Sequence, residues 1–309
     1  MMINTSDDLN NSVLNAFNEV EKPLVNEEDT ANFTDEEEFN QLGFLLLIEA
    51  GCYVCIAANT LDENEKWDRD TAAIGGNMVR LYKMISGLLD QTAQRRRDTS
   101  FIFARLVFET VVTIRYLIKH FSPEIVDSYV KNSLKHEVKL RSNIEKKIAA
   151  RGGVILPIED RMMKSIDRSF ASAGLDPSDL DGYRERNWGA RNLYEKAEDL
   201  GMGDAYLGAF SGPSNAVHGA WGDIYSHCLQ TDGDGLCAPN IEWGYPRPQL
   251  LTATANLSLF AVHDYFGFVF GPDLQEVVQG HLSDLATRLE ALDRAHEAYL
   301  APKEWPRIR

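Results

Sequence analysis

Hydrophobic residues recur with helical spacing over most of the chain beyond residue 35. Apolar positions three and four apart are typical of one face of an α-helix, and no pair of alternating segments indicates a β-hairpin. The segments with helical spacing lie at residues 35–61, 63–92, 99–120, 122–150, 158–174, 192–201, 204–210, 249–270 and 273–299, with a further helix around His218. The pattern therefore predicts an all-α protein, a multi-helix bundle.

Turn signals and charge divide the predicted helices into three parts. Ser122 followed by Pro123 is a strong helix start, and "RGG" at 151–153 ends that helix. We expect an acidic, mobile tail over 1–35, with a short helix near residues 9–22. The main bundle is expected over 36–230. A loop with a C-terminal helix pair, packed on the bundle, is expected over 231–309.

The charge of the chain is concentrated at its N-terminal end. The net charge is −16, and the first 38 residues hold eleven Asp or Glu and one Lys, leaving about −6 for the remainder. A broad nucleic-acid interface needs a basic face, which this composition lacks overall, although Arg95, Arg96 and Arg97 form a local basic cluster. The acidic tail is suited to contact a basic partner protein.

Composition also bears on location. The N-terminus lacks a basic stretch followed by an apolar run, so we expect no secretory leader. The most apolar stretches, 101–118 and 251–270, are interrupted by charged residues and are expected to be core helices rather than membrane spans. Four cysteines without a leader favour reduced thiols. We therefore expect a soluble cytoplasmic protein without membrane contact.

The helix at 99–120 carries charged residues in an otherwise apolar surface. A helix that is apolar on all sides belongs in the middle of a bundle. Arg105 and Glu109 lie four residues apart, share a face and can pair. A charged side chain is rarely buried without a partner. Two interpretations follow: the pair lines a functional cavity, or it is a buried salt bridge that fixes helix register.

The stretch "SGPSNAVHGAWGD" at 211–223 places one histidine among small residues. Continuing the helix through this stretch predicts a core stripe of Val217, Trp221, Ile224 and Cys228, with Ser214, His218 and Tyr225 beside it. His218 is then half-buried, with room around it for a substrate. It can serve as a general acid or base, or it can be a core histidine held by a hydrogen bond.

Metal and cofactor motifs are sparse. Cys52 and Cys55 form a single C-x-x-C within an apolar helix, where small cysteines are common core residues. The phosphate-loop, dinucleotide-binding and H-E-x-x-H patterns do not occur in the sequence. We therefore expect no metal site and no cofactor.

Three motifs together resemble a bacterial family of helical proteins known as domain of unknown function 5677. They are "RLVFETVVTIRYL", "RNWGARNLYEKAEDLGMGDAY" and "SGPSNAVHG", within about residues 75–230. The resemblance matches the family's Arg-x-x-x-Glu to Arg105 and Glu109, and its Ser-x-x-x-His-Gly to Ser214, His218 and Gly219. Its Trp is matched to Trp188. The resemblance implies that the two helices carrying these motifs face each other, so that Arg105, Glu109, Ser214 and His218 converge.

A looser similarity connects the chain to HEPN ribonucleases, helical proteins of toxin and antiviral systems that use an Arg and a His, usually in a dimer. In "RNWGAR" the pattern begins with Arg186, but Arg191 stands where the His would be. The similarity therefore implies that His218 pairs with Arg105 or Arg186 from elsewhere.

Two hypotheses of different classes remain. In the first, the protein is a metal-independent ribonuclease with His218, Arg105 and Glu109 as catalytic residues and Ser214, Asn215 and Trp188 as RNA-binding residues. In the second, it is a non-catalytic binding protein whose polar cluster is structural or holds a small ligand. A homodimer is compatible with either hypothesis.

Overall fold

The computed structural model describes residues 5–60, 66–231 and 235–303. Within these ranges the protein is helical apart from one two-stranded antiparallel sheet, which confirms the all-α prediction. The first half comprises α1 (Thr5–Glu19), α2 (Glu27–Ala31), α3 (Glu36–Asn59), α4 (Arg69–Ala93), α5 (Arg97–Lys119), α6 (Pro123–Ala150) and α7 (Pro157–Ala173). The second half comprises α8 (Leu193–Asp199), α9 (Gly203–Tyr206), α10 (Gly212–His218), α11 (Trp221–His227), β1 (Leu229–Thr231), β2 (Cys237–Pro239), α12 (Pro248–Val269) and α13 (Pro272–Leu300).

Local sequence signals explain where several helices begin and end. The Asp35 carboxylate accepts the N–H groups of Glu37 and Glu38, which caps α3, and Ser122 caps α6 ahead of Pro123. Gly174 ends α7 in the left-handed conformation, at φ 66°, which glycine adopts without strain. These caps satisfy backbone groups that the helix itself cannot pair.

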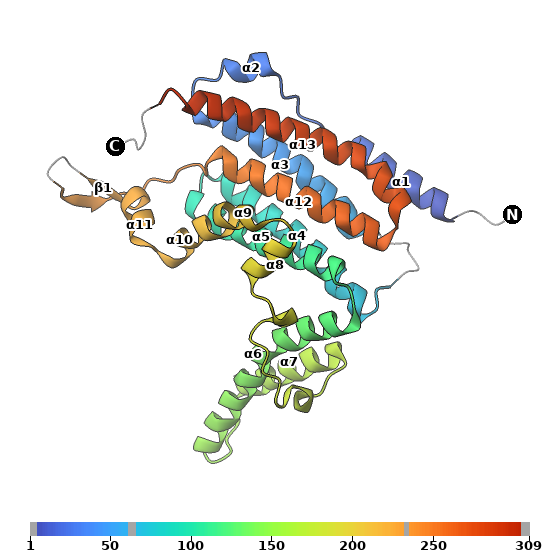
Figure 1. Ribbon diagram of the computed structural model, residues 1–309. Helices are drawn as coiled ribbons and strands as arrows, with labels where there is room; N and C mark the ends of the chain where they lie inside the picture. The colour runs from blue at the N-terminus through green and yellow to red at the C-terminus, as the bar shows by residue number, and fades with distance from the viewer. Residues whose placement is uncertain (1–4, 61–65, 232–234, 304–309) are drawn as a thin grey trace.

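The core lies among five long helices that pack side by side. Helix α5 packs against α4 and α12, and α12 packs in turn against α3 and α13 (Figure 1). The inward-facing side chains of these helices are almost fully buried, including Tyr53, Met78, Phe108, Tyr265 and Phe266. The apolar helix predicted around residue 108 is therefore a central element of the bundle, as its pattern indicated.

The acidic N-terminal segment is anchored to this core by a few apolar residues. Helix α1, near the short helix predicted at 9–22, packs on α3 and α13. Val13 and Phe17 are buried, and the Phe17 ring stacks on Tyr53 at 4.7 Å between centroids. Val13 and Phe17 thus attach α1 to the core, within the segment expected to be an acidic tail. Glu19, Glu21 and Lys22 in this segment are exposed, and its composition gave no sign of the two buried apolar residues. Residues 1–4 lie outside the described ranges.

A buried ion pair joins α13 to α3. The Arg288 guanidinium donates to both carboxylate oxygens of Glu49, each at 2.6 Å, and also to the Pro23 carbonyl at 3.0 Å. The Tyr53 hydroxyl donates to the same carboxylate at 2.7 Å, and desolvation, followed by that hydrogen bond to Glu49, raises the pKa of Tyr53. The Glu49 carboxylate is fully enclosed, so these donors replace the water it has lost.

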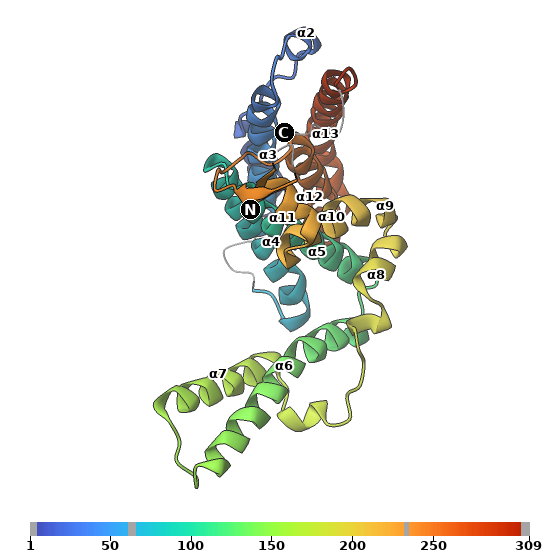
Figure 2. The same ribbon diagram turned by 90° about the vertical axis from the view of Figure 1, so that its left-hand side faces the viewer.

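Helices α6 and α7 form an arm that projects from the bundle (Figures 1 and 2). They have an apolar core of their own, which includes Leu134, Ile144, Ile166 and Phe170 and is separate from that of the bundle. The chain returns from α7 through two short 3-10 helices, η1 (Pro177–Leu180) and η2 (Trp188–Ala190), to α8 beside the bundle.

Among the described residues, one helix is long and apolar enough to cross a membrane by length and composition, namely α3. Half of its apolar window is buried by neighbouring helices, as is common in a core helix.

Removing the Phe17 ring tests whether α1 is part of the cooperative core. We expect Phe17→Ala to lower the free energy of unfolding by about 3–5 kcal/mol, since a fully buried ring is lost from a packed site. Urea unfolding measures the change. Leu24→Ala is the control, because Leu24 is 87% exposed and its loss should have almost no effect. Equal effects of the two substitutions would contradict the anchoring of α1.

Candidate functional site

Helices α5 and α10 pack against each other, as the resemblance implied, and bring Arg105 beside His218. The Arg105 Nη1 atom lies 3.4 Å from His218 Nε2, although the two residues are 113 positions apart in the chain. Arg105 Nε lies 3.6 Å from the Glu109 Oε1 atom one turn along α5. Arg105 thus lies next to both Glu109 and His218. Ser214, the fourth side chain expected to converge with them, instead donates to the Phe210 carbonyl.

The guanidinium of Arg105 packs on the face of an aromatic ring. The guanidinium carbon lies 4.4 Å from the centroid of the Phe210 ring, in cation–π contact. Phe210 stacks on Tyr206 at 4.9 Å and also contacts the buried Phe108 at 6.2 Å. The Arg105 side chain is 20% exposed. Its position is therefore fixed by packing while its charged end can still meet solvent.

Phe210 belongs to a segment whose role the sequence pattern did not indicate. The chain over η3 (Leu207–Ser211) is a π-helix, a rare conformation that occurs mostly as a single turn within α-helices and is frequent at functional sites. Residues 204–210 were predicted simply as a short helix. The sequence there reads "AYLGAFSG" before Pro213, a run of small and aromatic residues that did not distinguish a π-helix from an α-helix.

His218 lies at the surface, at the end of its helix. Helix α10 stops there because Gly219 adopts the left-handed conformation, at φ 60°. The predicted core stripe of Val217, Trp221, Ile224 and Cys228 is therefore wrong: the chain breaks before Trp221 and starts α11 in a new direction. Val217, Trp221 and Cys228 are exposed, and so is His218, which we expected to be half-buried.

Ser214 and Asn215 lie on the same short helix but differ in how they are engaged. The Ser214 hydroxyl donates to the Phe210 carbonyl at 2.6 Å, so it pairs with its own helix and stabilises the turn that follows η3. Asn215 is exposed, and its backbone carbonyl accepts the Ala220 N–H at 2.9 Å. The Asn215 side chain is the better placed of the two to contact a ligand.

Trp188 is not part of this cluster. Its ring packs against Tyr116 and Tyr129, each at 5.3 Å between centroids. Tyr116 is eleven residues beyond Arg105 on α5, about 16 Å along a helix. Trp188 was predicted as a substrate-binding residue with the others because the family resemblance matched it, but the chain carries it to the far end of α5.

At that end a charged cluster fastens α8 to α5. Asp199 accepts from His120 Nε2 at 2.7 Å and Arg191 Nη1 at 2.8 Å, and pairs with Lys119 at 3.1 Å. The hydrogen bond from His120, with those from Lys119 and Arg191, lowers the pKa of Asp199 strongly. Each member of the cluster thus has its partner within it, which indicates a structural role.

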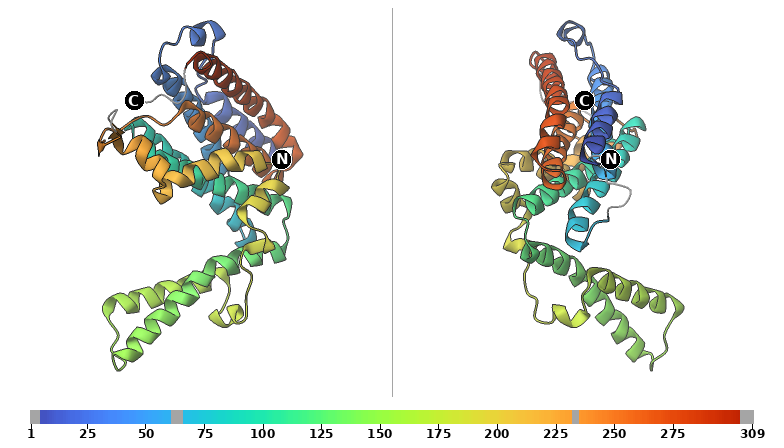
Figure 3. Two further views of the ribbon diagram at one scale, coloured as in Figure 1. Left: turned by 60° about the vertical axis from the view of Figure 1, so that its left-hand side comes forward. Right: turned by 90° about the vertical axis from the view of Figure 1, so that its right-hand side faces the viewer.

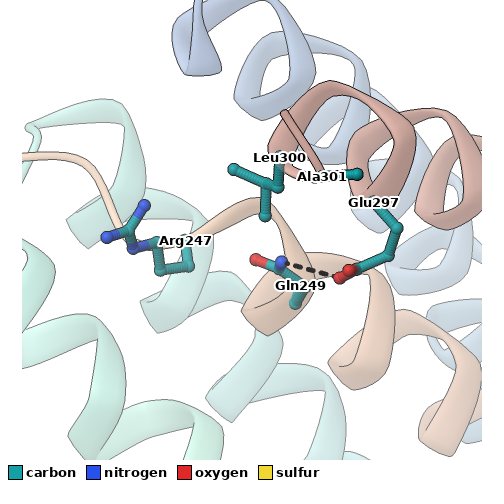
Figure 4. A pocket seen from close by; sticks show the side chains of 5 residues that line it. All are labelled: Arg247, Gln249, Glu297, Leu300 and Ala301. Carbon is teal, nitrogen blue, oxygen red and sulfur yellow. Dashed lines mark hydrogen bonds between the residues drawn. The ribbon is translucent and has the colours of Figure 1, made fainter. Parts of the chain in front are cut away.

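Two surface hollows lie away from the Arg105–His218 cluster. One, of about 510 Å³, is lined by Arg247, Gln249, Glu297, Leu300 and Ala301 (Figure 4). Arg247 is paired with Glu36 there, and Gln249 donates to Glu297 at 3.4 Å. The other, of about 630 Å³, lies near the Arg115–Asp264 ion pair and is lined by Arg115, Ile118, Lys119, Leu200, Asp264, Gly267, Phe268, Pro272 and Gln275.

The cysteines and other metal-ligating side chains do not form a cluster in the part of the chain that the structure describes. Cys52 and Cys55 lie within α3, whereas Cys228 and Cys237 are exposed near the two-stranded sheet. Over residues 5–60, 66–231 and 235–303, no group of three His, Cys, Asp or Glu side chains is arranged to hold a metal ion.

The fold and the cluster thus define a helical protein with an Arg–Glu–His surface site. Residues 71–236, just over half of the chain, match the model of a family described as "Family of unknown function (DUF5677)", and the protein belongs to this family. The match contains Arg105, Glu109 and His218, and it leaves out α1, α2, α3, β2, α12 and α13. No curated protein and no solved structure matches the chain.

Lys196 provides a test of the packing around Trp188. Its side chain is buried, with Nζ 3.6 Å from the centroid of the Trp188 ring and a hydrogen bond to the Arg191 carbonyl at 2.7 Å. Desolvation lowers the pKa of Lys196 to about 8 from its ordinary 10.5. The folded protein therefore releases this proton at a lower pH than the unfolded chain does, so between these values stability rises with pH.

We expect the wild type to gain about 1–2 kcal/mol of unfolding free energy relative to Lys196→Met between about pH 8 and about pH 10. Urea unfolding across this range measures the difference. Lys139→Met is the matched control, because Lys139 is exposed on α6 and should show no such trend. A pH-independent difference between wild type and Lys196→Met would contradict the burial of a charged Lys196.

Proposed function

We propose that the protein is a HEPN-like, metal-independent ribonuclease of a toxin-type or defence system, acting in the cytoplasm, with the Arg105–Glu109–His218 cluster as its catalytic site. The observation that carries this proposal is the 3.4 Å approach of Arg105 Nη1 to an exposed His218 Nε2. Cleavage of RNA through its 2′-hydroxyl needs a proton acceptor and a cation at the phosphate. The pair supplies both within one contact.

Each residue has a defined role in this proposal. His218 removes the proton of the 2′-hydroxyl as its oxygen attacks phosphorus, and histidine is suited to this because its ordinary pKa is near neutrality. Arg105 stabilises the charge that develops on the phosphorane. Glu109, 3.6 Å from Arg105, orients the guanidinium. The bond to the 5′ oxygen then breaks, that oxygen takes a proton from water, and the products carry a 2′,3′-cyclic phosphate and a 5′-hydroxyl.

Neighbouring residues favour a single-stranded substrate. Trp221 and Tyr225 are exposed on α11, which begins three residues after His218, and bases stack readily on such rings. Asn215 is exposed on the helix that carries His218 and can contact the sugar or a base. The departure of "RNWGAR" from the HEPN pattern is accommodated if His218 pairs with Arg105 rather than with Arg186.

The test is growth of a bacterial host expressing the protein, followed by purified protein with RNA. We expect wild type to slow growth and fragment RNA, and His218→Ala to reduce the cleavage rate about 100-fold or more, the usual contribution of a general acid or base. His136→Ala is the matched control, since His136 is exposed on α6 outside the cluster.

Because His218 is at the surface, both histidine variants should keep the wild-type Tm. The ribonuclease proposal is refuted if RNA stays intact with both the wild type and His218→Ala. It is also refuted if the two proteins cleave RNA equally. Fragments that end in a 2′,3′-cyclic phosphate would support the 2′-hydroxyl route.

A second candidate, a non-catalytic binding protein, is favoured by one observation. Large apolar side chains are more than half exposed between residues 207 and 243, namely Leu207, Trp221, Leu236, Ile241 and Trp243. Exposed apolar residues of this kind are typical of protein interfaces, including those of homodimers, while the acidic N-terminal segment suits a basic partner. Salt separates the candidates: RNA affinity should fall steeply as salt rises if phosphates are bound, and RNA should not bind at all in the second candidate.

A further inference from the structure

The end of the α6–α7 arm presents a row of apolar side chains to solvent. Between the two helices the chain reads "RGGVILPI", residues 151–158. Val154, Ile155, Leu156 and Ile158 are 59%, 58%, 41% and 51% exposed. Four large aliphatic side chains exposed together at a projecting tip are unusual, because water contact with each of them costs free energy.

Hydrogen bonds hold the backbone of this tip in one arrangement. The Arg151 guanidinium donates to the Val154 carbonyl at 3.4 Å and to the Glu159 carboxylate. The same carboxylate accepts the Leu156 N–H at 3.0 Å, and this bond, with the contact to Arg151, lowers the pKa of Glu159. The apolar side chains are therefore displayed by a fixed loop, which lowers the entropic cost of binding.

The charge of the arm is opposite to that of the rest of the chain. Residues 131–168 contain ten Lys or Arg and five Asp or Glu, a net charge of +5, so that the remainder of the −16 chain carries −21. Near the tip, Glu159 is paired with Arg151 and Asp160 with Lys164. Lys146, Lys147 and Arg161 are exposed there and form no ion pair within the described residues.

The length of the arm separates these charges from the acidic bundle. Figure 3 shows α6 and α7 extending away from the other helices. Helix α6 leaves the core of the bundle at about Leu134, where the second apolar core begins, and continues to Ala150, about 25 Å at the helical rise per residue. This exceeds the screening length of about 8 Å at physiological salt. The tip can therefore approach an anionic surface that would repel the bundle.

We propose that the tip of the arm docks on an anionic phospholipid surface. The four aliphatic side chains enter the interface between head groups and acyl chains, while Lys146, Lys147 and Arg161 contact the head-group phosphates. RNA would pair with the cations but would leave the four aliphatic side chains exposed. An anionic lipid surface would engage both the cations and the aliphatic side chains, so it is the better fit. This contact is peripheral and distinct from a membrane-spanning helix, and it goes beyond the proposed ribonuclease activity.

Sedimentation with vesicles tests the proposal on the full chain. We expect binding to vesicles of phosphatidylcholine mixed with an equal amount of phosphatidylglycerol, and little binding to phosphatidylcholine alone. Ile155→Asn combined with Ile158→Asn should weaken binding about tenfold or more, since two aliphatic side chains no longer enter the interface. Lys146→Gln combined with Lys147→Gln should weaken it to a similar degree, more so at low salt.

Leu207→Asn combined with Ile241→Asn is the matched control. Both residues are more than half exposed, outside the arm, and their replacement should leave vesicle binding unchanged. The tip variants should also keep the wild-type Tm because the altered side chains are exposed. The proposal is overturned if wild type ignores anionic vesicles, if it binds neutral vesicles equally, or if the isoleucine variant binds like wild type. Loss of RNA binding in the lysine variant alone, with vesicles ignored, would assign the cations to RNA instead.

Discussion

The need to cover α5 on nearly every side determines how the rest of the chain is arranged. Its apolar surface packs against α4 and α12, and α10 covers part of what remains. Three arginines on α5 then connect to segments more than 100 residues later in the chain. Arg97 pairs with Asp223, Arg105 contacts His218, and Arg115 pairs with Asp264. These contacts fasten α11, α10 and α12 to the central helix, so the same constraint that builds the core also assembles the surface cluster.

The middle arginine differs from the other two in a way that favours a functional role. Arg97 and Arg115 each meet a carboxylate of another helix, at 3.1 Å and 2.7 Å, which neutralises much of their charge. Arg105 meets an imidazole across the helices, and its own carboxylate partner is 3.6 Å away on the same helix. Its charge is thus less neutralised by its partners, while the Phe210 ring fixes its position. In the proposed ribonuclease, a phosphate of RNA would pair with this guanidinium.

Much of the fold could be predicted because helix boundaries depend on local chemistry. Ser122 with Pro123 marked the start of α6, and the apolar pattern around Phe108 indicated a central helix. The Arg105–His218 contact is non-local, and only the family resemblance suggested it. The stripe through Val217 failed because one glycine, Gly219, turns the chain within a pattern that continues past it. The contacts of Trp188 and Phe17 were not predicted for a similar reason. Their partners lie on other helices, and the periodicity of one segment does not show which helices pack together.

The net charge of the whole chain conceals that the arm and the bundle carry charges of opposite sign. A net charge of −16 argues against binding any polyanion, yet residues 131–168 carry +5, and the tip of this arm lies about 25 Å along α6 from the point where it leaves the bundle. The basic residues are visible in the sequence. The aliphatic run at 154–158 is visible as well, but a run of this kind is ordinarily assigned to a core. Its exposure follows from the arm's own packing, in which Ile144 and Ile166 already fill the space between α6 and α7 and leave the tip without a partner. The basic residues and the aliphatic run indicate one docking surface only because the fold places both of them at the tip of the arm.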